Sequence, residues 1–357
     1  MDRYIGLDAH AASCTLAIVS EAGKRLRDFP VETNGAALVE AVRSVQGRRH
    51  LIFEEGTQSA WLYETLARHV DEIVVTGVIR SRGPKSDRGD AYGLAEKLRI
   101  GAVDKPVFKA PTEFTRLREF ARVHAMLVGD VVRVQARLKF IYRSRAVPTS
   151  GTALYSPARR DQWQGQLPEA SRAVTTKLYA HYDFFLELKK QAEQELTAES
   201  HRHPIARILQ TAPGFGPIRV ARLLPIVVTP HRFRTRRQFW SYCGLGIVMR
   251  SSSDWVRNEA GQWQRAQVAR TRGLSRQHNH AIKAIFKGAA TTIIQQGKPQ
   301  EIYADYARLL DCGTKPNLAK LTLARKIAAI VLHMWKEQEV YRAEKVANTT
   351  ATQRATE

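Results

Sequence analysis

The chain has 357 residues, of which 44% are hydrophobic, so it is long enough to form two or three domains with their own cores. Its formal net charge at pH 7 is +22, and this charge is unevenly distributed. Residues 1–110 contain 16 Lys or Arg against 15 Asp or Glu, whereas residues 205–300 contain 16 against 2. A nearly neutral region joined to a very basic one favours separate chemical and polyanion-binding parts.

Cysteine usage and hydropathy exclude further classes of protein. The three cysteines have no paired spacing, so the sequence predicts neither a disulfide framework nor a zinc site. No apolar stretch is long enough to cross a bilayer, and the N-terminus has no signal-peptide core. We therefore expect a cytoplasmic protein that does not insert into membranes and whose partner is nucleic acid.

Residues 1–110 alternate short apolar strands with helices. Three strands come first, and a helix, a strand, a helix, a strand and a helix follow. This order predicts an α/β domain of the RNase-H/RuvC-like type, because a dinucleotide-binding sheet would need a Gly-rich loop where Ala9-His10-Ala11 stands. The expected elements are Tyr4–Asp8, Thr15–Ser20, Arg27–Val31, Asn34–Val45 (with Asn34 as N-cap), His50–Glu54, Gln58–His69, Glu72–Gly77 and Asp87–Arg99.

Beyond this domain the pattern is mainly helical. Residues 112–145 and 168–203 have helical periodicity, and between them lies a segment rich in Pro, Gly and Ser, from Pro148 to Gln164. They predict an antiparallel coiled-coil arm with a connector over residues 111–204, usable for self-association. An ordinary helical bundle is the alternative.

Four carboxylates are candidates for a metal site. Asp8 ends an apolar strand, Glu55 follows another, and Asp87 and Asp90 share one helical face at spacing i, i+3. In an RNase-H-like fold these positions converge, and gathered carboxylates repel each other unless a hard cation lies between them. The sequence therefore predicts Mg²⁺ (or Mn²⁺) at all four. Glu54 adjoins Glu55, but alternation sends the two side chains to opposite faces, and we assign the metal to Glu55.

A helix-hairpin-helix motif is expected near the start of a basic domain, residues 205–300. One helix ends at Pro213-Gly214, and the next begins at Gly216-Pro217. Such glycines let the backbone approach a phosphate, a contact that carries no sequence information. A final helix, Leu318–Ala347, and a polar tail are expected in residues 301–357. The candidate nucleic-acid-binding residues are Gly214, Gly216, Arg219, Arg234, Arg236, Arg237, Arg250 and Arg257.

Several short motifs within residues 4–295 occur together in one family. They are Tyr4-Ile5-Gly6-Leu7-Asp8, Glu55-Gly56-Thr57, Lys85-Ser86-Asp87-Arg88-Gly89-Asp90-Ala91, Pro213-Gly214-Phe215-Gly216-Pro217, Gly244-Leu245, Ser251-Ser252-Ser253 and Gly273-Leu274-Ser275-Arg276-Gln277-His278-Asn279-His280. In this combination the chain resembles the DEDD transposases of the insertion-sequence-110 family, which include the Piv-type DNA invertases.

The resemblance implies a composite active site. Its first part is the RNase-H/RuvC-like domain, whose four acids bind divalent metal. Its second is a mainly α transposase domain with a nucleophilic serine. By position after Gly244-Leu245 the nucleophile falls on Ser252, but Ser253 stands where the family commonly has Gly. Ser251 and Ser253 therefore stay alternatives.

The resemblance also implies partners and a mechanism. In the family a structured noncoding RNA bridges donor and target DNA, so we expect these partners and a homo-oligomer, dimer to tetramer, acting on a bacterial or archaeal genome. Ser252 would attack a phosphate polarised by the metal, and Arg250 and Arg257 would neutralise the developing charge. The alternatives are a RuvC-like nuclease in which water attacks, and a non-catalytic protein that binds nucleic acid.

Overall fold

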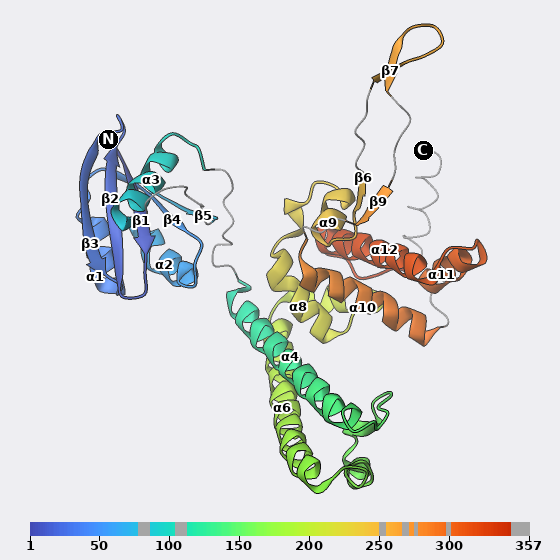
Figure 1. Ribbon diagram of the computed structural model, residues 1–357. Helices are drawn as coiled ribbons and strands as arrows, with labels where there is room; N and C mark the ends of the chain where they lie inside the picture. The colour runs from blue at the N-terminus through green and yellow to red at the C-terminus, as the bar shows by residue number, and fades with distance from the viewer. Residues whose placement is uncertain are drawn as a thin grey trace. The chain divides into compact units, whose positions relative to one another are not determined.

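The computed structural model describes residues 1–77, 86–103, 113–249, 255–265, 271–274, 278–297 and 301–343 (Figure 1). The chain divides into two compact units, unit 1 (Met1–Glu113) and unit 2 (Phe114–Glu357). No helix in the described ranges combines the length and the apolar character needed to cross a membrane. Arg250 and the candidate nucleophiles Ser251, Ser252 and Ser253 lie outside the described residues.

A five-stranded sheet forms the centre of unit 1, in the order β3-β2-β1-β4-β5. β1, β2 and β3 form an antiparallel meander, and β4 and β5 run parallel to β1. This α/β arrangement confirms the mixed sheet predicted for the N-terminal domain and fits an RNase-H-like fold. The elements are β1 Asp2–Ala9, β2 Ser13–Ser20, β3 Arg25–Glu32, α1 Gly35–Arg43, β4 Arg48–Glu54, α2 Ser59–Leu66, β5 Glu72–Thr76 and α3 Asp87–Arg99.

The two faces of this sheet carry different helices. On one face Leu38 of α1 and Leu62 of α2 share a buried cluster with Phe53 of β4. On the other face Leu94 of α3 packs with Ile52 of β4. Because Ile52 and Phe53 are successive residues of one strand, their side chains point to opposite faces. Each polar residue at a strand end can therefore be assigned to a face by counting from the core.

The close approach of α3 to β1 depends on Gly6. A Cβ atom added to Gly6 would lie 1.9 Å from the carbonyl oxygen of Ala91 and 2.8 Å from the nitrogen of Ala95. Both are backbone atoms of α3, so they cannot move aside unless the helix moves. The missing side chain thus determines how closely α3, which begins with Asp87, lies on β1.

We expect Gly6→Ala to destabilise unit 1 by about 3 kcal/mol, because overpacking against backbone atoms cannot be relieved by a change of rotamer. Gly93→Ala is the matched control. Gly93 is an exposed residue of α3 whose added Cβ would meet nothing within 4 Å, so alanine there should stabilise the helix by about 0.5–1 kcal/mol. Urea unfolding measures both variants. A Gly6→Ala protein as stable as wild type would contradict the close packing of α3.

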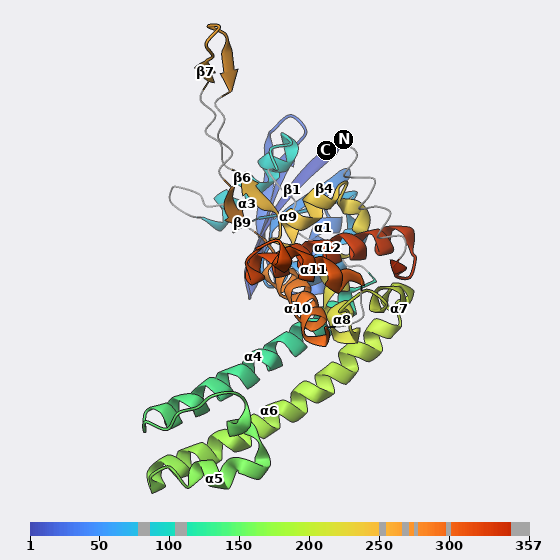
Figure 2. The same cartoon turned by 90° about the vertical axis from the view of Figure 1, so that its right-hand side faces the viewer.

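Two long helices open unit 2. α4 (Thr115–Arg143) and α6 (Glu169–His201) run side by side in opposite directions (Figures 1 and 2). At one end of the pair the hydroxyl oxygens of Tyr142 and Tyr179 lie 3.1 Å apart, and the Tyr179 hydroxyl donates to the carbonyl of Leu154 at 3.0 Å. The connector between the helices is therefore tied to their packed side chains. Self-association through this pair stays a prediction.

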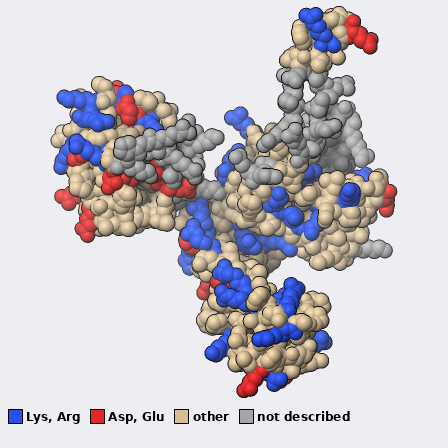
Figure 3. Space-filling view, viewed as in Figure 1, with Lys and Arg blue, Asp and Glu red and all other residues tan. Residues whose placement is uncertain are grey.

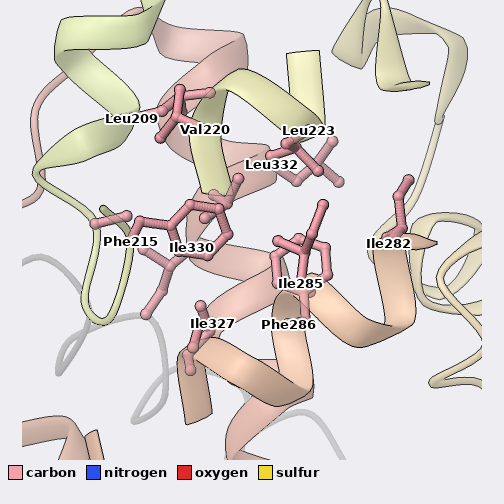
Figure 4. Packing of buried hydrophobic residues seen from close by; sticks show 14 of the residues in the cluster. Leu209, Phe215, Val220, Leu223, Ile282, Ile285, Phe286, Ile327, Ile330 and Leu332 are labelled. Carbon is pink, nitrogen blue, oxygen red and sulfur yellow. The ribbon is translucent and has the colours of Figure 1, made fainter. Parts of the chain in front are cut away.

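The remaining helices of unit 2 surround a second hydrophobic core, to which Leu117 of α4 and Leu196 of α6 also belong. Phe215, Phe286 and Ile327 are among its buried residues (Figure 4). This helical region agrees with the expected mainly α character of the C-terminal half. The elements are α5 Arg160–Gln164, α7 Pro204–Gln210, α8 Pro217–Val227, α9 Arg236–Tyr242, β6 Ile247–Met249, β7 Trp255–Arg257, β8 Trp263–Arg265, β9 Thr271–Leu274, α10 His280–Gln296, α11 Glu301–Asp311 and α12 Pro316–Glu337.

The last helix ends earlier than its sequence pattern predicts. Gln338, the C-cap of α12, adopts a left-handed conformation with φ of 55°. The backbone N–H of Glu339 then donates to the carbonyl of Met334, a contact that closes the helix end. The expectation of one continuous helix from Leu318 to Ala347 is therefore wrong, because the helix is interrupted at Gln338, and residues 344–347 lie outside the described residues.

Candidate metal centre and nucleic-acid interface

Asp8 lies near the carboxyl end of β1, on the face that α3 covers. Leu7, the residue before it, belongs to the core beneath α1 and α2, and Gly6 touches α3. Alternation along the strand therefore turns Asp8 toward α3. The side chain of Asp8 is 23% exposed, so its carboxyl group is partly withdrawn from water.

Asp87 and Asp90 occupy the first turn of α3. The hydroxyl of Ser86 caps this helix by accepting a hydrogen bond from a first-turn backbone N–H at 3.1 Å. Carboxylates are favourable in this turn because the helix dipole is positive there. Arg88, which stands between the two acids in the sequence, forms its ion pair with Asp28 at 2.8 Å. Arg88 therefore pairs with Asp28 and not with either of the two acids beside it in the sequence.

Asp8, His10 and Asp87 form a compact cluster. Each contributes one potential ligand atom, and these three atoms lie within 4.8 Å of one another. The Nε2 atom of His10 is 3.3 Å from Asp8 Oδ2 and 3.5 Å from Asp87 Oδ1. The fold thus brings two of the four predicted carboxylates together, from the ends of β1 and α3, and adds an imidazole to them.

The electrostatics of Asp8 extend this cluster to Asp90. Burial raises the pKa of Asp8, and the negative charges of Asp87 and Asp90 raise this pKa further, whereas His10 lowers it. Asp90 therefore acts on Asp8 although it is not one of the three clustered residues. The folded protein resists the ionised form of Asp8, and a bound cation would favour it.

The fourth predicted carboxylate, Glu55, immediately follows β4. Its backbone N–H donates to the carbonyl of Thr76 at 2.7 Å, and its side chain is exposed. Glu54 is the last residue of β4, and because Ile52 packs against α3, alternation directs Glu54 to the same face as Asp8. Neither glutamate is among the residues clustered within 4.8 Å. The role of Glu55 stays a prediction, with Glu54 on the α3 face beside it.

The donor set fits a hard divalent cation. Asp8 and Asp87 offer carboxylate oxygens, and Asp90 lies one helical turn from Asp87. Mg²⁺ and Mn²⁺ prefer such oxygen ligands, and the imidazole of His10 offers a nitrogen as a further donor. A cation here would offset the mutual repulsion that raises the pKa of Asp8.

His10 had no strong signal in the sequence. It stands two residues after Asp8, in a turn in which its N–H donates to the carbonyl of Ser13 at 3.1 Å. The hydroxyl of Thr33, the residue after β3, donates to the His10 carbonyl at 2.9 Å and fixes the turn. The proximity of His10 to Asp87 depends on these contacts, and neither can be recognised from the spacing to Asp8 alone.

We expect the cation-free protein to lose stability as the pH rises through the raised pKa of Asp8. The folded-state pKa lies above the unfolded one, so the folded protein binds more protons in this range and its stability falls with increasing pH. Asp8→Asn removes this ionisation. The variant should unfold at a higher temperature than wild type at pH 7 without divalent cation, and the difference should shrink on acidification.

Divalent cation should reverse this order of stability, so that wild type unfolds at a higher temperature than Asp8→Asn. A cation at 100 times its Kd stabilises the folded protein by about 2.7 kcal/mol, and Asp8→Asn should gain much less than wild type. Glu64→Gln, on the exposed side of α2, is the charge-matched control. Thermal unfolding with and without Mg²⁺ or Mn²⁺ measures the response. An equal gain in Asp8→Asn and wild type would rule out a cation site at Asp8.

The turn between α7 and α8 is shaped by packing inside unit 2. Gly214 has φ of +72°, and a Cβ there would lie 2.6 Å from the carbonyl oxygen of Ala289. Arg219 donates to the Gly214 carbonyl at 2.6 Å and to the Thr292 hydroxyl at 2.9 Å, and burial lowers the pKa of Arg219. A Cβ on Gly216 would meet nothing within 4 Å. Gly216 is therefore the most open of the three residues predicted to contact phosphate here.

The other described candidates for nucleic-acid contact are exposed arginines. Arg234, Arg236 and Arg237 lie at or just before the start of α9. Arg257 lies on β7, with its guanidinium 5.1 Å from the ring centroid of Trp263 on β8. On the face drawn in Figure 3, Asp and Glu are most evident on unit 1, whereas unit 2 shows mainly Lys and Arg. These groups suit phosphate contacts and stacking on bases.

Comparisons with known proteins agree with both regions. Residues 5–141 match a family of transposases of the DEDD, IS110 type, and residues 206–307 match the transposase family IS116/IS110/IS902. The two matches cover 239 of the 357 residues. A Streptomyces clavuligerus protein, described as an uncharacterized 44.8 kDa protein of insertion element IS116, is 23% identical over 399 aligned positions, covering 95% of this chain and 96% of that protein.

Proposed function

Because the chain belongs to the IS116/IS110/IS902 family of transposases, enzymes that cut and rejoin DNA, we propose that it does so by serine attack on a phosphodiester polarised at the unit 1 carboxylates. The observation that carries this proposal is the convergence of Asp8 and Asp87, with Asp90 acting on Asp8. Transposition depends on a divalent metal in DEDD-type enzymes, and the cluster offers the ligands for one.

Asp8, Glu55, Asp87 and Asp90 would hold Mg²⁺ or Mn²⁺. The cation would supply Lewis-acid polarisation of the scissile phosphate. The carboxylates would fix where that cation, and through it the phosphate, is held, near the end of β1 and the first turn of α3. His10, within 3.5 Å of both Asp8 and Asp87, would hold these two carboxylates in place.

Ser252 would provide the nucleophile, with Ser251 and Ser253 as the alternatives. The serine oxygen bonds to phosphorus while the bond from phosphorus to the leaving strand breaks, and the serine proton ends on the leaving hydroxyl. The new phosphoserine link keeps the energy of the phosphodiester. A DNA hydroxyl then attacks this link, rejoins the strand and restores the serine. Arg250 and Arg257 would neutralise charge in the transition state.

The basic residues of unit 2 would hold the nucleic acids. Arg234, Arg236 and Arg237 are exposed, and the open backbone at Gly216 leaves room for a phosphate. Donor and target DNA are the substrates of such an enzyme. A net charge of +22 also supports a third polyanion, a structured noncoding RNA that bridges the two DNAs.

The paired helices α4 and α6 support a homo-oligomer, dimer to tetramer. Several large apolar side chains on these helices are exposed, among them Met126 at 62%, Phe140 at 69% and Phe184 at 60%. Such side chains are unfavourable in water and favour burial against a second copy of the arm.

We expect Ser252→Ala to abolish the covalent protein–DNA adduct that accumulates when rejoining is blocked. The nearest controls are Ser251→Ala and Ser253→Ala, which should still form it. Denaturing electrophoresis of labelled DNA detects the adduct, and mass spectrometry of the attached peptide identifies the serine. An adduct that persists in Ser252→Ala would remove this residue from the mechanism.

The same experiment separates a transposase that acts through serine from a nuclease in which water attacks. The nuclease mechanism predicts hydrolysed strand ends, no adduct in the wild-type protein and full cleavage by Ser252→Ala. Asp8→Asn should abolish cleavage in either case, because both mechanisms need the carboxylates at the ends of β1 and α3.

Glu54 and Glu55 can be distinguished by paired substitutions. We expect Glu55→Gln to slow strand cleavage about 100-fold, the effect of losing about 2.7 kcal/mol of transition-state stabilisation from one ligand. Glu54→Gln should slow it less than about tenfold. Single-turnover cleavage at saturating DNA measures both rates. The reverse order would assign the fourth carboxylate to Glu54, which alternation places on the α3 face.

A further inference from the structure

A basic pocket lies in unit 1 apart from the carboxylate cluster. Its volume is about 540 Å³. Three arginines line it from three different elements: Arg43 ends α1, Arg49 is the second residue of β4, and Arg68 lies in the turn after α2. The full lining is Arg43, Arg49, Arg68, His69, Val70 and Asp71.

The positive charge of this pocket is only partly neutralised by the protein. Among the described residues, no carboxylate oxygen lies within 4.0 Å of the side-chain nitrogens of Arg43, Arg49 or Arg68. Asp71 is the one acid of the lining, and its carboxylate accepts the backbone N–H of Arg49 at 2.7 Å. Three guanidinium groups therefore face one carboxylate that is already engaged.

Two polar groups of the pocket point to an anionic ligand. The Nε atom of Arg49 is buried and has no hydrogen-bond partner, an arrangement that costs free energy unless an acceptor arrives. His69 accepts a hydrogen bond from Arg43 Nε at 3.3 Å on its Nδ1 atom. Desolvation and the charges of the three arginines lower the pKa of His69, which favours the neutral imidazole that accepts this hydrogen bond and orients the Arg43 guanidinium.

The pocket and the carboxylates occupy opposite ends of the same strands. Arg49 stands at the start of β4 and Asp71 directly before β5, whereas Asp8 is near the end of β1, which runs parallel to both. The seven residues of β4 span roughly 20 Å. A ligand in the pocket is therefore too far away to be the phosphate that reacts at Asp8.

We propose that this pocket binds the phosphate backbone of a nucleic-acid segment that is not being cut. Planar guanidinium groups form paired hydrogen bonds with phosphate oxygens, and three from separate elements surround one phosphate better than a flat surface would. A transposase must hold more nucleic acid than the strand it cleaves, and the inference rests on the proposed function only in this respect. DNA and RNA offer the same phosphate chemistry.

The test is the salt dependence of binding by the full-length protein. Arg43→Gln/Arg68→Gln removes two exposed cations from the pocket, and Arg25→Gln/Arg27→Gln removes two exposed cations from β3 as the matched control. Fluorescence anisotropy measures binding of a DNA duplex, a DNA single strand and an RNA hairpin at salt concentrations between about 50 and 200 mM. Each phosphate contact that is lost changes the slope of log K against log[salt] by about 0.7–0.9.

The pocket variant should bind at least one of the three probes about tenfold more weakly and with a slope smaller by about 1.4–1.8, and the control should change less. The probe whose binding weakens identifies whether the pocket holds DNA or RNA. Equal changes in both variants, or none in the pocket variant, would overturn the proposal. The proposal would also be overturned if inorganic phosphate bound in the pocket and left nucleic-acid binding unchanged. The readout needs no cleavage, so it holds or fails independently of the Ser252 adduct.

Discussion

The contact between Gly6 and the backbone of α3 is the constraint on which the candidate site depends. Only a residue without a side chain lets the Ala91 carbonyl come as close to β1 as it does. This approach places the first turn of α3, with Asp87 and Asp90, beside Asp8 at the end of the same strand. A packing detail in the middle of the strand thereby determines the distance between acids at its end.

The same packing has an electrostatic cost. Asp8 is partly buried beside two further acids, and its pKa is raised, so the cation-free protein is less stable than it would be with a neutral residue there. The helix dipole of α3 and its Ser86 cap favour the carboxylates of the first turn, but they do not relieve Asp8. A site that binds a cation tolerates such a loss of stability, and a bound divalent cation would restore the stability that the clustered carboxylates cost.

The fold of unit 1 could be predicted well from its sequence because each strand and helix has a local signal. The predicted N-cap Asn34 accepts the N–H of Ala37 at 2.8 Å, and the order of strands and helices is confirmed. The candidate site could be predicted less completely than the fold. Strand alternation distinguishes Glu54 from Glu55 only once Ile52 is known to face α3, and His10 reaches the cluster through a turn fixed by the residue after β3. Both depend on contacts between elements, which no spacing reveals.

Unit 2 illustrates a different limit. The sequence predicts that its glycines open the backbone to phosphate, yet Gly214 packs against Ala289 of α10, a contact that no local pattern in the sequence reveals. A glycine needed for close packing and one needed for a ligand look alike until the opposing element is known. Gly216 is the N-cap of α8 and is open at its α-carbon, so its predicted contact with phosphate stays a prediction, whereas Gly214 has a structural role.

The candidate carboxylates and the basic pocket of unit 1 lie at opposite ends of its sheet, although Asp2, Asp71 and Glu72 also lie at the end with the arginines. Acids gather at the carboxyl ends of β1 and β4, and Arg43, Arg49 and Arg68 gather near the amino end of β4. A polyanion is therefore attracted to one end of the sheet and repelled from the other until a cation occupies the acids. We infer from both proposals that nucleic acid can associate with unit 1 at the arginine end of the sheet without divalent metal, whereas cutting at the proposed site requires the cation. Binding and cleavage should thus separate in their metal requirement, as expected when one small domain has to hold one segment while it acts on another.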